Sequence, residues 1–226
     1  MVIGATVYTQ VTYDQLEEQA NDRHLTILGG FHPQPDDDVP PDAKTLLLLG
    51  PHDPGFWPAF KASPEWRDRQ ADPMDRWSTR VIGDWAEFLG AKPLYPFGGA
   101  PFLPFFSWAK RSGRIHASPI MLLIHDTAGL LVSFRGALAL GKHVALPPPP
   151  PSPCDTCSTK PCTTACPVGA FAAGGYDVPK CKSYLETLAG QDCMTRGCAA
   201  RRACPVSTRY PRDEEQSAYH MTVFKG

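Results

Sequence analysis

All eight cysteines of this 226-residue chain lie in residues 154–204, and residues 1–153 contain none. A disulfide framework would connect the whole fold, whereas a cofactor site concentrates its ligands in one region. The chain is long enough for one domain with its own apolar core and a small appendage. The cysteines therefore predict a metal or cofactor centre in the C-terminal appendage.

The cysteines fall into two groups of four, and each group ends in Cys-Pro. The first reads Cys-x2-Cys-x4-Cys-x3-Cys-Pro over residues 154–167, and the second ends in Cys-x4-Cys-x5-Cys-Pro at residue 205. A [4Fe-4S] cluster takes four thiolates, so eight cysteines match two clusters. In two-cluster ferredoxins the last cysteine of each run ligates the other cluster. This rule groups Cys154, Cys157 and Cys162 with Cys204, and Cys181, Cys193 and Cys198 with Cys166.

The spacing leaves other chemistry open. Both groups are longer than the x2, x2, x3 pattern of bacterial ferredoxins. Structural zinc also takes four thiolates from paired cysteines. A zinc site, a single cluster, and disulfides or unligated thiols therefore remain alternatives to two clusters.

Charge and hydropathy limit the partners and the compartment. The formal net charge of −1 provides no basic field for nucleic acid or an acidic membrane surface. Residues 1–10 lack the basic and apolar regions of a secretion signal, and the longest aliphatic run, Leu46–Leu49, is far too short to span a bilayer. We expect a cytoplasmic protein, where thiols stay reduced, with no nucleic-acid or membrane partner.

Hydrophobic periodicity predicts both helices and strands in the first region. Thr12 precedes a predicted helix over residues 13–23, and residues 45–49 predict a buried strand ended by Gly50-Pro51. Residues 73–89 predict a longer helix between Asp72 at the N-cap and Gly90. Its apolar face is predicted to contain Met74, Trp77, Val81, Trp85 and Phe88.

The remaining patterns predict an α+β fold. Residues 102–110 predict a further helix, and residues 120–125 and 130–140 predict two strands joined as a hairpin; residues 25–28 are too short to assign. A proline-rich connector at 147–153 would separate an N-terminal domain, 1–146, from a small two-cluster domain with a C-terminal tail, 154–226. The alternative is that the proline run is a surface loop of one continuous domain.

The second region resembles the two-cluster domain of epoxyqueuosine reductase, a cobalamin-dependent enzyme. The resemblance lies in the Cys-x2-Cys…Cys-x3-Cys-Pro run, the isolated Cys181 in CKSYL, and the final Cys-Pro. Similar domains occur in reductive dehalogenases, which also use cobalamin. In both families the resemblance implies a preceding nitroreductase-like α+β domain that binds the corrinoid, but nothing here matches the tRNA-recognising parts of the reductase.

The first region resembles the cobalamin-trafficking chaperone that removes the upper ligand of cobalamin. The matching stretches are DPMD at 72–75 and IHDTAGLLVSFRGALAL at 124–140. This resemblance implies the same nitroreductase-like fold and a corrinoid pocket that includes His125, Arg135 and Gly136. On ordinary grounds, His125 could equally be a core or turn histidine, and Arg135 could face solvent or bind an anionic group.

Two further segments could contribute to a site. The aromatic stretch at 98–108 is most simply core, or else an apolar wall over a planar cofactor. Gln216, Tyr219 and His220 in the tail suggest a docked helix or loop, or else contacts with a cluster or a corrinoid.

These observations predict an iron–sulfur redox protein, with catalytic residues that the sequence does not identify. Two [4Fe-4S] clusters would pass single electrons to a cofactor or substrate, such as a corrinoid, held by the N-terminal domain. The partner would be a redox protein or a small-molecule substrate. The alternatives are a ferredoxin-type carrier without catalysis and a zinc-stabilised interaction module.

Overall fold

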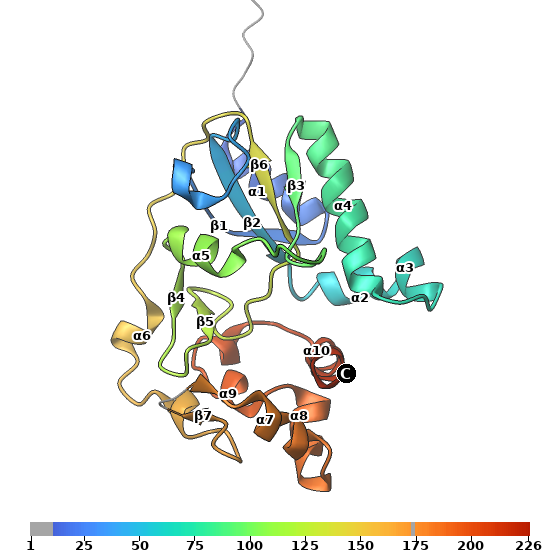
Figure 1. Cartoon of the computed structure of the whole chain (residues 1–226), viewed down its shortest axis with the longest axis vertical. Helices are drawn as coiled ribbons and strands as arrows, with labels where there is room; N and C mark the ends of the chain where they lie inside the picture. Colours follow the sequence, from blue (N-terminus) through green and yellow to red (C-terminus); the bar gives the residue numbers. More distant parts are fainter. Residues whose placement is uncertain (1–10, 173–174) are drawn as a thin grey trace, which may run out of the picture.

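The computed structural model describes residues 11–172 and 175–226 (Figure 1), so the predictions about residues 1–10 lie outside the described residues. The fold is a mixed α+β arrangement, with a sheet and its helices in the upper part of Figure 1 and short helices in the lower part. The four-stranded sheet has the order β1-β2-β6-β3, and all its neighbours are antiparallel. Its strands are β1 (Leu25–Phe31), β2 (Thr45–Pro51), β6 (Gly136–Leu140) and β3 (Lys92–Leu94).

Helices cover both faces of this sheet, and β2 is buried along its whole length. Alternate residues of a strand point to opposite faces. Leu47 and Leu49 therefore join one core with the first helices, while Leu46 and Leu48 join a second core on the other face. The first core is covered by α1 (Tyr13–Asp22), α2 (Phe56–Lys61) and α4 (Pro73–Leu89), and the second by α5 (Phe105–Arg111).

The predicted helices form, with small changes at their ends. Thr12 and Gln15 make a capping box at the start of α1. In α4, Asp72 is the N-cap residue but its side chain makes no capping hydrogen bond, and Gly90 ends the helix in the left-handed conformation. The predicted face of α4 is wrong at one end, because Phe88 is 72% exposed.

The predicted hairpin between residues 120–125 and 130–140 is wrong. The first of these strands is reduced to β5 (Leu123–His125), which pairs with β4 (Ile115–Ala117). The second is β6, which is inserted between β2 and β3 of the main sheet. Apolar runs predict that strands exist but not which strands pair with one another. Here β6 pairs within the main sheet, where helices cover both of its faces.

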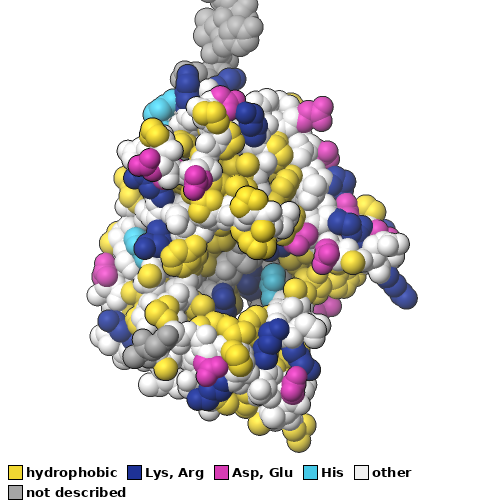
Figure 2. All heavy atoms as spheres, in the orientation of Figure 1, with side chains coloured by type: hydrophobic (Ala, Val, Ile, Leu, Met, Phe, Trp, Pro, Cys, Tyr) yellow, Lys and Arg dark blue, Asp and Glu magenta, His cyan; other side chains and the backbone are white. Residues whose placement is uncertain are grey.

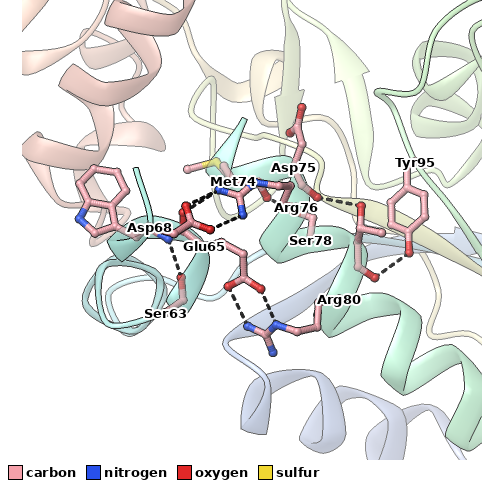
Figure 3. Close-up of polar contacts among 11 residues, drawn as sticks. Ser63, Glu65, Asp68, Met74, Asp75, Arg76, Ser78, Arg80 and Tyr95 are labelled. Atoms are coloured by element: carbon pink, nitrogen blue, oxygen red, sulfur yellow. Dashed lines mark hydrogen bonds and ion pairs between the residues drawn. The ribbon is translucent and has the colours of Figure 1, made fainter. Parts of the chain in front are cut away.

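Ion pairs fix the corner between α3 (Pro64–Arg67) and α4, as Figure 3 shows. Arg76 binds Asp68 at 2.7 Å, and Arg80 binds the largely buried Glu65 at 2.5 Å and 3.0 Å. The hydrogen bond from Arg80 is the main reason why the pKa of Glu65 lies below its ordinary value. In Figure 3 the carboxylate of Asp75 points away from Arg80, so it can pair with a residue outside this corner.

The C-terminal part is built from short helices connected by turns. Residues 141–152 reach it without regular structure, and Pro149 lies close to Gly113 on the way. The bounds are α6 (Pro153–Thr156), η2 (Pro161–Thr163), β7 (Phe171–Ala172), β8 (Gly175–Tyr176), α7 (Val178–Leu185), η3 (Leu188–Gly190), α8 (Gln191–Arg196), α9 (Ala199–Arg202), η4 (Ser207–Arg209) and α10 (Glu214–Lys225); η1 (Pro35–Asp37) belongs to the upper part.

Helix α10 joins the two parts, and the prediction of a docked C-terminal helix is confirmed. Tyr219 packs among Trp57, Phe60 and Trp66, with ring centroids 5.5–6.1 Å away. Helix α10 also packs against α8 in the lower part. Gly197, at the end of α8, has φ +88°, and a Cβ on it would lie 2.8 Å from Ser217 of α10. Glycine is therefore required at the turn before Cys198.

No helix in the described ranges is long and apolar enough to cross a bilayer.

Candidate functional site

Four of the cysteines surround one cavity in the lower part of the molecule. Cys154 lies in α6, Cys157 caps that helix, Cys162 lies in η2, and Cys204 follows α9. Together they line a cavity of about 330 Å³. We call them the first thiol group. Cys204 is about forty residues away in sequence, and it is the residue that the crossing rule assigns to this group.

The other four cysteines surround a second, narrower space. Cys166 follows η2, Cys181 lies in α7, Cys193 lies in α8, and Cys198 is the N-cap of α9. They line a cavity of about 20 Å³, which also touches Met221 of α10. We call them the second thiol group. The structure thus brings the cysteines together in the two sets that the sequence rule predicts, while their role as metal ligands stays a prediction.

Burial is the main cause of the raised pKa values of several thiols. It raises the pKa of Cys154 and Cys162, and the neighbouring cysteines of the first group raise it further. Burial likewise raises the pKa of Cys181, although a hydrogen bond with Tyr176 opposes this. Mutual repulsion of four close thiolates is relieved when a cation binds them, so clusters of thiols of this kind suit a metal centre.

All eight thiols are free of disulfide bonds. Within residues 11–172 and 175–226, no three His, Cys, Asp or Glu side chains converge on a point where a single metal ion could bind. The thiols instead line the cavities described above.

A third cavity, of about 260 Å³, lies between the upper and lower parts, and we call it the central cavity. In Figure 2 the surface is hollowed between these parts, with basic and His side chains visible in the hollow. Cys181 and Cys198 of the second thiol group lie in its wall. The full lining consists of Leu122, Leu131, Val132, Ser133, Phe171, Tyr176, Cys181, Gly197, Cys198, Arg201, Arg212, Ser217, His220, Met221 and Phe224.

Arg212 is held in the wall of the central cavity by a buried polar network. Its Nε lies 3.4 Å from Asp53 Oδ2, and neither side chain is more than 6% exposed. With its amide oriented to match donors to acceptors, Gln216 donates to Asp53 at 2.8 Å and accepts from Arg212 at 3.2 Å. Burial raises the pKa of Asp53 in spite of Arg212. This network ties α10 to the loop after β2 and orients Arg212.

His125 lies outside the central cavity and has a structural role. It is 2% exposed, and its Nδ1 accepts hydrogen bonds from the backbone N–H groups of Thr127 and Ala128 at 3.2 Å. Its Nε2 therefore bears the hydrogen, which faces Leu28 O at 2.9 Å and Asp126 at 3.0 Å. Both ring nitrogens are thus engaged within the fold, as in a core or turn histidine.

Arg135 and Gly136 lie at the start of β6. Arg135 is 3.6 Å from Asp75, and burial, partly offset by that carboxylate, lowers its pKa to about 10. Its Nε is buried and has no hydrogen-bond partner in the part of the chain that the structure describes. Gly136 contacts Ile82 and the carbonyl of Leu94 inside the sheet. The structure therefore does not gather His125, Arg135 and Gly136 around the central cavity, and their cofactor-binding roles remain predictions.

The aromatic stretch and the C-terminal tail contribute mainly to the core and to the docking of α10. In the aromatic stretch 98–108, Phe105 and Trp108 belong to the core, while Phe102 and Phe106 are exposed. None of these residues lines the central cavity. In the tail, Tyr219 and Gln216 dock α10, and only His220 reaches the cavity.

Sequence reasoning did not single out Arg201 or Arg212. Both follow cysteine-rich turns in which basic residues look like ordinary surface positions. The available signal was Arg201 itself, three residues after Cys198 and three before Cys204, at helical spacing beside two predicted ligands.

Comparisons with known proteins identify one distant structural likeness. A crystal structure of selenomethionine-labeled epoxyqueuosine reductase is similar over 91% of this chain, with 16% sequence identity and a TM-score of 0.41. The chain covers 64% of that protein, less than two thirds of its length. A TM-score this low does not establish a shared fold. No protein-family model and no curated protein matches the chain.

Proposed function

We propose that this protein is an iron–sulfur redox protein that holds two [4Fe-4S] clusters and passes single electrons to a small molecule in the central cavity. The observation that supports it is the arrangement of the thiols. Eight cysteines from several short helices and turns gather as two sets of four, and each set contains the Cys-Pro cysteine of the other sequence group. Four thiols per set is the donor number of a [4Fe-4S] cluster, which supplies one-electron transfer when bound.

The chain contributes position and surroundings. Pro167 and Pro205 follow the two crossing cysteines, Cys166 and Cys204, and have no N–H. The Ala170 N–H donates to Cys166 Sγ at 3.3 Å, a type of contact that tunes cluster potentials. Because Cys181 and Cys198 line both the second thiol cavity and the central cavity, a molecule bound there would lie beside the second thiol group.

A corrinoid, which the sequence resemblance implied, fits the described cavity poorly. Sites for drug-sized ligands range from roughly 300 to 1,000 Å³, and the central cavity, about 260 Å³, lies below that range. His125 and Gly136 are committed to contacts inside the fold. The acceptor in this proposal is therefore a smaller molecule, and a titration with cob(II)alamin that changed its absorption spectrum would restore the corrinoid.

The proposal is tested by anaerobic purification with iron and sulfide analysis and EPR spectra. We expect about eight irons per chain from two four-iron clusters. Zinc in stoichiometric amounts without cluster absorption would instead support the zinc-stabilised module. Two intact clusters with no ligand of any kind in the central cavity would support the electron-carrier alternative.

Two matched variants test the crossed grouping. Cys204→Ser should damage the cluster held by Cys154, Cys157 and Cys162, and Cys166→Ser should damage the other one. Each variant is the control for its partner, since both remove a Cys-Pro cysteine. If each serine instead disturbed the cluster nearest in sequence, the crossed grouping would be refuted.

A further inference from the structure

The central cavity has basic side chains in its wall. Arg201 and Arg212 line it together with His220, and no Asp or Glu among residues 11–172 and 175–226 does. The carboxylate of Asp53, behind the wall, is already paired with Arg212. Among the Asp, Glu, Lys, Arg and His side chains of the described residues, the cavity therefore presents only basic ones to whatever enters it.

Arg201 is less compensated by carboxylates than Arg212 is. It lies in α9, and its Nη1 donates to Leu130 O at 2.6 Å. In the described part of the chain no carboxylate lies within ion-pair distance of its guanidinium, and the charges it senses come from Cys198, Arg212 and Tyr176. Burial lowers its pKa. A guanidinium in this position gains most from an anionic partner that accepts hydrogen bonds.

His220 provides a second, independent sign of a ligand. Its Nε2 is buried and has no hydrogen-bond partner within the described residues. Burial and the nearby charges of Arg212, Arg135 and Arg201 hold the pKa of His220 well below its usual range. An unpaired buried polar atom is costly in a folded protein, and a bound ligand would pair it.

Three nearly parallel aromatic rings line another part of the cavity. The ring of Tyr176 lies 4.6 Å from that of Phe171 and 6.1 Å from that of Phe224, with interplanar angles of 20° and 14°. All three rings line the central cavity, as do Leu131 and Met221. Parallel aromatic rings favour a planar group beside them.

We infer that the central cavity binds a small organic anion, with its carboxylate or phosphate on Arg201, Arg212 and His220 and its planar apolar body against the Phe171–Tyr176–Phe224 wall. The volume of about 260 Å³ suits a molecule of one ring. This binding site stands on the cavity alone. Only the role of the anion as electron acceptor rests on the proposed function, through the adjacent Cys181 and Cys198.

The test is calorimetric titration of the anaerobically purified holoprotein with benzoate and with benzamide, its neutral analogue. Benzoate should bind at least tenfold more tightly, because only it offers a negative charge to the arginines. Equal affinity for the two, or no binding of benzoate, would overturn the inference. This comparison uses the unaltered chain, so it does not depend on any variant folding.

Variants then locate the anion. Arg201→Gln should weaken benzoate at least tenfold, Arg201→Lys should recover part of the loss, and Arg196→Gln, at a 51% exposed side chain on α8, should change nothing. If Arg201→Gln altered the cluster spectra but left benzoate binding intact, Arg201 would serve the thiol group and the assignment would be wrong.

Iron content separates the two proposals. A protein with about eight irons that does not bind benzoate would refute the anion site and leave the proposed function intact. A protein without clusters that binds benzoate would refute the proposed function and leave the anion site intact.

Discussion

Replacing Gly129 by alanine should loosen the contact between the upper and lower parts of the molecule. Gly129 has φ +59°, and a Cβ there would lie 2.5 Å from both the backbone N and the Oγ of Ser207. The left-handed conformation costs a non-glycine residue roughly 1–2 kcal/mol. Ser207 Oγ also accepts a hydrogen bond from Leu130 N–H at 2.9 Å, worth about 1 kcal/mol, which the displaced serine would lose. We expect Gly129→Ala to lower the free energy of unfolding by about 3 kcal/mol.

Gly90→Ala is the matched control for this prediction. Gly90 has φ +63°, almost the same conformation, but a Cβ there would meet nothing within 4 Å. It should therefore cost only the conformational part, roughly 1–2 kcal/mol. Both variants can be compared by urea unfolding under anaerobic conditions, followed by circular dichroism and tryptophan fluorescence. If Gly129→Ala were no more destabilising than Gly90→Ala, the close packing of Gly129 on Ser207 would be refuted.

Three further predictions concern the ion pairs, α10 and the thiols. Although burial opposes it, hydrogen bonds from His125 and Arg114 lower the pKa of Asp126 to about 2. A carboxylate with a depressed pKa stabilises the fold above its unfolded pKa and loses this effect as the pH falls through the folded value. Asp126→Asn should therefore cost about 2 kcal/mol at pH 7 and progressively less between pH ~4 and ~2, whereas a cost independent of pH would contradict it. Tyr219→Ala should lower the free energy of unfolding in urea by about 2–3 kcal/mol, because it removes the packing against Trp57, Phe60 and Trp66. Val223→Ala, at a 62% exposed position of the same helix, should change it by less than about 0.5 kcal/mol. Equal effects of the two variants would refute the docking of α10. Cys204→Ser should abolish the EPR signal of one cluster and leave the other, with iron falling from about eight to about four per chain.

The tertiary structure decided which strands pair and where the site lies. The apolar runs at 120–125 and 130–140 were visible in the sequence, but β5 turned to β4 while β6 entered the main sheet. Strand pairing depends on which helical faces are available to bury each side, and periodicity does not contain that information. The bonding of His125 was likewise not predictable, because its ring bonds to the turn at 127–128 and to Leu28, which is far away in sequence; its cofactor contact remains a prediction.

The sequence alone determined the local features and the grouping of the thiols. Thr12 marked the start of α1, and Asp72 and Gly90 marked the ends of α4, because capping depends on a few adjacent residues. The two Cys-Pro runs indicated the crossed sets of four because the two-cluster ferredoxin rule assigns the last cysteine of each run to the other set. The central cavity was beyond the reach of the sequence. Arg201 lies in α9, Arg212 in the segment before α10, and His220 in α10. They meet because the Asp53–Arg212–Gln216 network and the packing of Tyr219 fix α10 between the two parts of the fold.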